Sequence, residues 1–146
     1  VMLDQISDPQ NIGAIIRSSA AFNIGKIILP KDNAPDENAS IAKAASGCLE
    51  LVQIAKVTNI KQTIETLKNK GFWIAGLDSK GQNNLKEIVD IDKVAVIIGS
   101  EGKGMRKLTS ESCDFLIKIP ISEQVESLNA SNAASIIFHL LNLHYI

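Results

Sequence analysis

The amino-acid sequence predicts an α/β fold with a mostly parallel sheet flanked by helices. Short apolar segments alternate with helical segments along the whole chain, which is the order expected of α/β proteins. The apolar segments lack the alternation of a strand with one face in water, so helices are expected to cover both faces of the sheet. A length of 146 residues, without a long linker, a low-complexity segment or an internal repeat, fits one domain.

The candidate strands are short segments rich in Ile, Val, Leu and Phe. They are residues 26–29, 51–55, 72–77, 94–98 and 115–119. Their length and composition are typical of strands buried on both faces.

The candidate helices carry start and stop signals. Gly47 and Gly71 are placed to end two of them, and Thr58 is placed to cap the start of another. The predicted helices are residues 11–22, 39–46, 59–70, about 104–112 and about 128–143.

Composition and charge limit the class of protein. With 45% hydrophobic and 21% charged residues the chain reads as a soluble globular protein. A net charge of -1 argues against a domain that binds nucleic acid unaided, because neutralising phosphates supplies most non-specific affinity. An RNA or DNA partner would therefore need a local basic patch or help from elsewhere.

No membrane segment, secretory leader or metal-ligand spacing is found in the sequence. Cys48 and Cys113 are far apart and are interpreted as small core residues, and His139 and His144 have no carboxylate at metal spacing. The expected location is the cytoplasm. The chain starts "VMLDQ" without an initiator Met, so we expect it to be one domain of a longer protein.

Three loops at the carboxyl ends of predicted strands are the places where a ligand is expected. These loops span residues 77–80, 99–104 and 120–127. The second belongs to "IIGSEGKGM", residues 97–105, which matches neither the phosphate loop GxxxxGK[ST] nor the dinucleotide pattern GxGxxG. A nucleotide-like ligand of this loop would therefore be held by a different chemistry.

A second notable stretch is "SDPQNIGAIIRSSAAF", residues 7–22. Asn11 is placed to cap the helix, and Gly13 permits close approach of another backbone. Arg17 follows Asn11 by six positions, which is about 120° around a helix, so a shared site requires the helix to begin after Asn11. The alternative is a capped amphipathic helix with an exposed arginine.

The third stretch is "IPISEQVESLNASNAASIIFHLL", residues 119–141. A loop follows Pro120, and a helix is expected to start at Ser127 or Leu128. Its first turns are rich in Ala and Ser, which allow close packing. The alternative is an Ala-rich core helix without a further role.

In order and spacing, these three stretches resemble the motifs of the SpoU (TrmH-like) branch of the SPOUT methyltransferase superfamily. The matching segments are "NIGAIIR", "IIGSEGKGM" and "IPISEQVESLNAS", with "KAASGCLELV" as a further family element. The resemblance covers essentially the whole chain. Asn23 replaces a common Gly, Cys48 the usual Ala and Ala130 a frequent Val, and none of these changes removes a functional group.

The resemblance implies a C-terminal deep trefoil knot, in which the last helix threads through an earlier loop. Residues 1–146 would be the catalytic domain, without the N-terminal RNA-binding extension found in some members. The knot loops would bind S-adenosylmethionine in a bent form, and a homodimer would complete the active site. The implied cofactor contacts are Leu77, Asp78, Ser79, Gly99, Ser100, Gly102, Gly104, Met105, Ile119, Ile121, Ser127 and Leu128.

The implied reaction is methyl transfer to a ribose 2'-hydroxyl of RNA. A guanidinium is a poor base, so Arg17 is expected to stabilise the developing alkoxide and hold a phosphate. Asn11 would orient the ribose or Arg17, Glu101 would fix the arginine or the loop, and Ser127 and Asn129 would bind target or cofactor.

The predicted RNA contacts are Arg17, Lys103, Arg106 and Lys107. For the last three, the polar face of a short helix is the alternative. Ribosomal RNA, with guanosine favoured, is the expected substrate, and transfer RNA is the alternative. A non-catalytic RNA-binding module of the same fold and a Rossmann-type nucleotide enzyme are the rival functions. Trp73 is interpreted as a core residue of its strand, and a platform on which a base stacks is the alternative.

Overall fold

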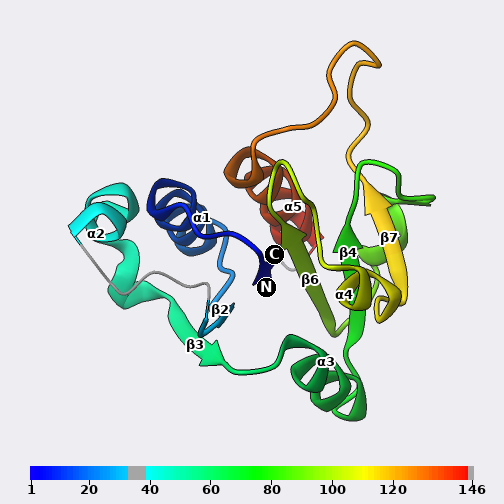
Figure 1. The fold of residues 1–146 in the computed structure, drawn as a ribbon, viewed down its shortest axis with the longest axis horizontal. Coiled ribbons are helices and arrows are strands. Elements are labelled where there is room, and N and C mark those ends of the chain that lie inside the picture. Colours follow the sequence, from blue (N-terminus) through cyan, green and yellow to red (C-terminus); the bar gives the residue numbers. More distant parts are fainter. Residues whose placement is uncertain (33–38, 145–146) are drawn as a thin grey trace.

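The computed structural model describes residues 1–32 and 39–144, and it places them in an α/β fold around one parallel sheet (Figure 1). The strands are β1 (Met2–Asp4), β2 (Lys26–Pro30), β3 (Gln53–Val57), β4 (Trp73–Leu77), β5 (Asn83–Asn84), β6 (Val94–Gly99) and β7 (Phe115–Lys118). Their order in the sheet is β3-β2-β1-β6-β4-β7-β5, and every recorded pair is parallel. The predicted fold class, a parallel sheet flanked by helices, is confirmed.

Two strands were not predicted, and one was predicted too early. β1 has only three residues, yet it lies between β2 and β6 and is fully buried. β5 has two residues at the sheet edge. Neither is long enough to give a periodic signal. The segment predicted to start a strand at residue 51 instead ends a 3-10 helix, η1 (Cys48–Leu51), and β3 follows at Gln53.

The helices lie near their predicted ranges but begin at different caps. They are α1 (Pro9–Ala21), α2 (Ala39–Ala45), α3 (Ile60–Asn69), α4 (Lys107–Glu111) and α5 (Ala130–His144), with a 3-10 turn η2 (Leu85–Ile88). Asp8 caps α1 by accepting from Gln10 N at 3.1 Å, so the prediction of Asn11 as the cap was wrong. Asn59, not Thr58, caps α3.

Two apolar clusters lie on opposite faces of the sheet. The larger packs α1 and α5 against strands, with Phe138 fully buried among them. The smaller packs Ile60 and Ile64 of α3 against Ile74 and Ile97. Figure 1 shows α1 and α5 side by side, and a hydrogen bond of 2.7 Å between Ser18 Oγ and Ser135 Oγ joins them.

The interpretation of Trp73 as a core residue was wrong. Trp73 is the first residue of β4, its exposed fraction is 51%, and its ring lies 5.6 Å from that of Phe115. A strand's first residue extends past the helices that cover its centre, so an aromatic side chain there stays partly in water.

The parallel arrangement brings the carboxyl ends of all strands to one edge of the sheet. At that edge the segment between β7 and α5 extends away from the sheet, and residues 122–126 are exposed (Figure 1). None of the helices within the described ranges combines the length and the apolar character needed to cross a bilayer.

Candidate functional site

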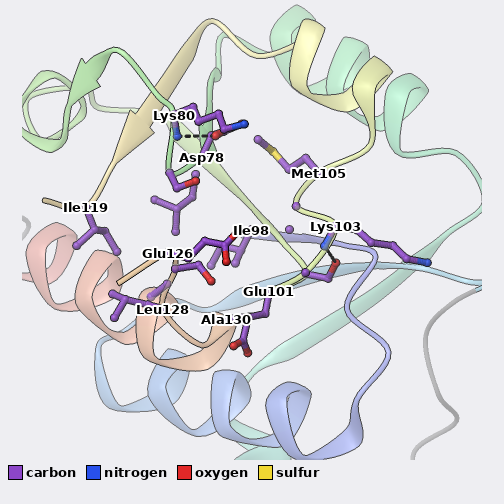
Figure 2. Close-up of a pocket in the computed structure, with 18 of the residues that line it drawn as sticks. Asp78, Lys80, Ile98, Glu101, Lys103, Met105, Ile119, Glu126, Leu128 and Ala130 are labelled. Atoms are coloured by element: carbon purple, nitrogen blue, oxygen red, sulfur yellow. Dashed lines mark hydrogen bonds between the residues drawn. The ribbon is translucent and has the colours of Figure 1, made fainter. Parts of the chain in front are cut away.

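A cavity of about 550 Å³ lies at the carboxyl ends of β4, β6 and β7 (Figure 2). All the residues predicted to contact the cofactor line it, from Leu77 to Leu128. The lining also includes residues that were not predicted to contact the cofactor, which are Lys80, Ile98, Glu101, Lys103, Glu126, Ala130 and Ala133. Each lies within about five positions of a residue that was predicted to contact the cofactor, so closeness in the sequence is the signal that could have identified them.

Apolar and polar side chains both line the cavity. Figure 2 shows Ile119 and Leu128 across the cavity from Met105. Acidic Asp78, Glu101 and Glu126 and basic Lys80 and Lys103 also line it, so its charge is mixed. Walls that combine apolar side chains with polar groups of both signs suit a neutral or zwitterionic organic ligand of moderate size.

The glycine-rich loop is closed on itself between Ser100 and Gly104. Gly104 N donates to Ser100 O at 2.8 Å, and Ser100 N donates to Gly104 O at 3.2 Å. Gly104 has φ +66°, and a Cβ placed on Gly99 would lie 2.2 Å from the carbonyl carbon of Gly104. Both glycines are therefore required by the backbone of this loop.

The loop after β4 is shaped by Asp78. Its Oδ1 accepts from Lys80 N at 2.8 Å, and its main-chain oxygen accepts from Gly81 N at 3.0 Å. A Cβ on Gly81 would lie 2.5 Å from Leu116 O, so the loop is also held close to β7. These contacts fix Leu77, Asp78 and the neighbouring residues at the cavity wall.

Asn129 joins the first and third motifs beside the cavity. Its Nδ2 donates to Asn11 Oδ1 at 3.0 Å and lies 3.5 Å from Glu101 Oε2. Its Oδ1 accepts from Ser131 N at 2.9 Å at the start of α5. Three of the five predicted catalytic residues therefore meet, and a fourth, Ser127, lines the cavity.

Arg17 is not brought to this cluster. Because α1 begins at Pro9, Asn11 and Arg17 both lie on the helix and point about 120° apart. Arg17 is exposed, does not line the cavity, and has no hydrogen bond or ion pair with the part of the chain that the structure describes.

The other predicted RNA contacts differ in their surroundings. Lys103 is exposed on the glycine-rich loop, and Lys107 Nζ lies 3.8 Å from Glu111 Oε1. Arg106 instead lies beside the fully buried Asp4: Arg106 N donates to Asp4 Oδ2 at 2.8 Å, and its Nε is 3.0 Å from Asp4 Oδ1. Residues 1–32 and 39–144 hold no group of His, Cys, Asp and Glu arranged for a metal ion.

Known proteins match this chain over most of its length. The sequence pattern described as the SpoU rRNA Methylase family matches residues 1–139. YacO of Bacillus subtilis (strain 168), named for the TrmH family of tRNA/rRNA methyltransferases, is 40% identical over 139 residues. That match covers 95% of this chain and 56% of YacO, so the chain spans little more than half of that relative's length.

Solved structures have the same fold. The TrmH/SpoU tRNA modifying enzyme of A. aeolicus has a TM-score of 0.87 and 28% identity, over 98% of this chain and 73% of that one. The SpoU methyltransferase AviRb of Streptomyces viridochromogenes, solved with AdoMet, has a TM-score of 0.90 and 23% identity, over 99% of this chain and 56% of its own. AdoMet is S-adenosylmethionine, the cofactor predicted from the sequence, and the prediction is confirmed for the family.

Proposed function

Because this chain belongs to the SpoU rRNA Methylase family, we propose that it is the catalytic domain of an S-adenosylmethionine-dependent RNA ribose 2'-O-methyltransferase. The observation that carries the proposal is the meeting of three sequence-distant loops at one cavity, with the Asn11, Glu101 and Asn129 cluster beside it. A cavity of about 550 Å³ is within the range of small-molecule sites.

The residues at the cavity fit the cofactor. Main-chain groups of the Gly99 to Gly104 loop are available to its polar parts, and Leu77, Ile119 and Leu128 offer apolar surface to the adenine. The cofactor supplies an electrophilic methyl group on a sulfonium. The glycines allow the closed loop that forms this wall, as the 2.2 Å approach at Gly99 indicates.

At the ribose, we propose that the polar residues position the substrate and stabilise charge and do not act as general bases. Arg17 holds a phosphate, an oxygen of which accepts the proton that the 2'-hydroxyl loses, and its guanidinium, which stays charged, stabilises the alkoxide. Asn11 and Asn129 orient the ribose, Glu101 fixes the loop, and Ser127 binds target or cofactor. Positioning of this kind supplies several kcal/mol of barrier reduction.

A second copy of the chain is needed in this proposal to bring Arg17 to a cavity. Arg17 does not line the cavity of its own chain. On the neighbouring α5, Ile136 and Leu143 are 40% and 61% exposed and lie seven positions apart, on one face of the helix. We propose that this face meets its equivalent in a homodimer and that Arg17 serves the partner's site.

The knot is part of the same proposal. The segment between β7 and α5 leaves the sheet edge and returns to a helix whose Ala130, Ala133 and Ala134 are buried. Small buried side chains suit the close approach that threading requires. The proposed location is the cytoplasm.

Ribosomal RNA, with guanosine as the methylated nucleoside, is the proposed substrate, and the proposed RNA contacts are Arg17, Lys103 and Lys107. Transfer RNA is the alternative, favoured by the tRNA modifying enzyme among the structural neighbours. The test is to incubate the chain with methyl-labelled S-adenosylmethionine and with either ribosomal RNA or transfer RNA. Both RNA fractions are purified from a strain that lacks the gene.

Alkaline hydrolysis then distinguishes the site of methylation. A 2'-O-methyl group blocks cleavage of the adjacent phosphodiester, so label in alkali-resistant dinucleotides supports the proposal. Label in mononucleotides would place the methyl on a base and refute it. Cofactor binding without transfer to either fraction would favour the non-catalytic RNA-binding module.

A further inference from the structure

Asp4 contacts both ends of the glycine-rich loop. It is the last residue of β1, it is fully buried, and its backbone is in register with Gly99, where the loop begins. Its Oδ2 accepts from the main-chain N–H of Arg106 at 2.8 Å, directly after the loop ends at Met105. One residue of a neighbouring strand thus contacts the loop at both ends, in addition to the two main-chain hydrogen bonds between Ser100 and Gly104.

The second oxygen of Asp4 depends on the Arg106 side chain. Arg106 Nε lies 3.0 Å from Asp4 Oδ1, which has no well-aligned hydrogen bond. A carboxylate without access to water is costly unless an opposite charge compensates it. The Arg106 guanidinium therefore compensates the buried charge of Asp4, although the Arg106 side chain is 44% exposed.

Gln5, the residue after Asp4, also holds the glycine-rich loop. Gln5 Nε2 donates to Gly104 O at 3.1 Å, so a second side chain from the end of β1 holds the last part of the loop. Gly104 and Met105, next to these contacts, both line the cavity. The Asp4 and Arg106 pair therefore lies next to residues that form part of the cavity wall.

We propose that Asp4 and Arg106 are positioning residues that hold the Gly99 to Met105 loop in its cofactor-binding shape, and that Arg106 does not act as an RNA ligand. This inference rests on the proposed function, in which that loop binds S-adenosylmethionine. A loop held in its bound shape binds its ligand more tightly because less ordering is required.

The test compares Arg106→Ala with Lys68→Ala. Lys68 is a matched control because Lys68 Nζ lies 2.7 Å from Asp114 Oδ1, while Asp114 Oδ2 accepts from Ile74 N at 2.8 Å. This pair also joins a cation to a carboxylate that accepts from a main-chain N–H, and it lies at the opposite edge of the sheet, where β4 and β7 begin. Calorimetry measures the Kd for S-adenosylmethionine, and filter binding measures the Kd for total ribosomal RNA.

Arg106→Ala is expected to raise the cofactor Kd at least tenfold and to change the RNA Kd less than twofold, whereas Lys68→Ala changes neither. Adding Asp4→Asn to Arg106→Ala is expected to restore part of the cofactor affinity, because the buried charge is removed with its partner. An unchanged cofactor Kd together with weaker RNA binding in Arg106→Ala would overturn the inference.

Hydrogen exchange gives a readout that does not depend on the cofactor. The amides of Gly104 and Arg106 are both hydrogen-bonded and are expected to exchange faster in Arg106→Ala and in Asp4→Asn, the latter serving if Arg106→Ala does not fold. Unchanged exchange in both variants would overturn the inference. If the unsubstituted chain does not bind S-adenosylmethionine but exchange still accelerates, the proposed function fails and the positioning role stands.

Discussion

The side-chain amides of Asn11 and Asn129 meet in a hydrogen bond of 3.0 Å although 118 positions separate them in the sequence. The bond joins the first turn of α1 to the residue that precedes α5. Asn129 has a second task, because its Oδ1 also accepts from the main chain of Ser131. The two asparagines therefore differ in their roles: both join the first motif to the third, but only Asn129 also caps α5. Substituting each one separately distinguishes the two roles.

Asn129→Ala is expected to lower the free energy of unfolding by about 1 kcal/mol more than Asn11→Ala does, because only Asn129 caps a helix. Both variants are expected to lower kcat. Urea unfolding followed by circular dichroism measures the first effect, and single-turnover methyl transfer measures the second. Equal loss of stability in the two variants would contradict the capping role.

Arg17→Ala is expected to reduce methyl transfer at least about a hundredfold and to change the cofactor Kd by less than about tenfold. The reason is that Arg17 is exposed outside the cavity of its own chain and is proposed to act on the ribose and phosphate. Lys43→Ala, which removes an exposed cation from α2, is the control. Normal transfer by Arg17→Ala would exclude the assigned role.

Gly99→Ala is expected to abolish cofactor binding, because the new Cβ would lie 2.2 Å from a backbone carbon of Gly104 and backbone does not move aside cheaply. Gly25→Ala is the control, since a Cβ there has no atom of the described chain within 4 Å. Isothermal calorimetry with S-adenosylmethionine compares the two. Wild-type affinity in Gly99→Ala would show that the loop rearranges freely.

Leu143→Asp is expected to convert the proposed dimer to a monomer and to reduce methyl transfer, because a charge buried in the proposed apolar interface is costly. Leu51→Asp is the control, as Leu51 is 70% exposed in η1 and lies outside the proposed interface. Size-exclusion chromatography with light scattering gives the mass of each variant. A monomeric unsubstituted chain with full activity would refute the shared site.

Burial raises the pKa of the Cys113 thiol to about 11, from an ordinary value of 9.0. The folded protein therefore retains this proton between about pH 9 and 11 while the unfolded chain releases it, and stability declines as pH rises through that window. Iodoacetamide at pH 8 is expected to label Cys113 slowly in the folded protein and readily in urea. Mass spectrometry of the peptide measures both rates, and equal rates would contradict the burial.

The sequence predicted the sheet and the cavity wall better than it predicted the arrangement of charges. Strands 94–98 and 26–29 agree with β6 and β2 because continuous apolar runs are a strong local signal. The three motif loops converge on one cavity because parallel strands share a carboxyl edge. These features follow from local pattern and elementary topology.

The partnership of Asp4 with Arg106 could not be predicted in this way. The two residues are 102 positions apart, and β1, the interior strand that carries Asp4, was too short to be recognised. The cap of α1 was also misplaced, because Asp8 and Asn11 are both good caps and the sequence does not decide between them. Asn23 has φ +58°, which explains how it fills a place where the family commonly has Gly.

The exposed position of Trp73 determines what optical experiments can report. Trp73 is the chain's single tryptophan, and it lies at the start of β4, whereas the cavity is formed where that strand ends. Intrinsic fluorescence therefore monitors the amino edge of the sheet, and a cofactor titration followed by tryptophan emission would give little signal even at full occupancy. A reporter introduced in the loop between β7 and α5 would be the better choice for following ligand entry.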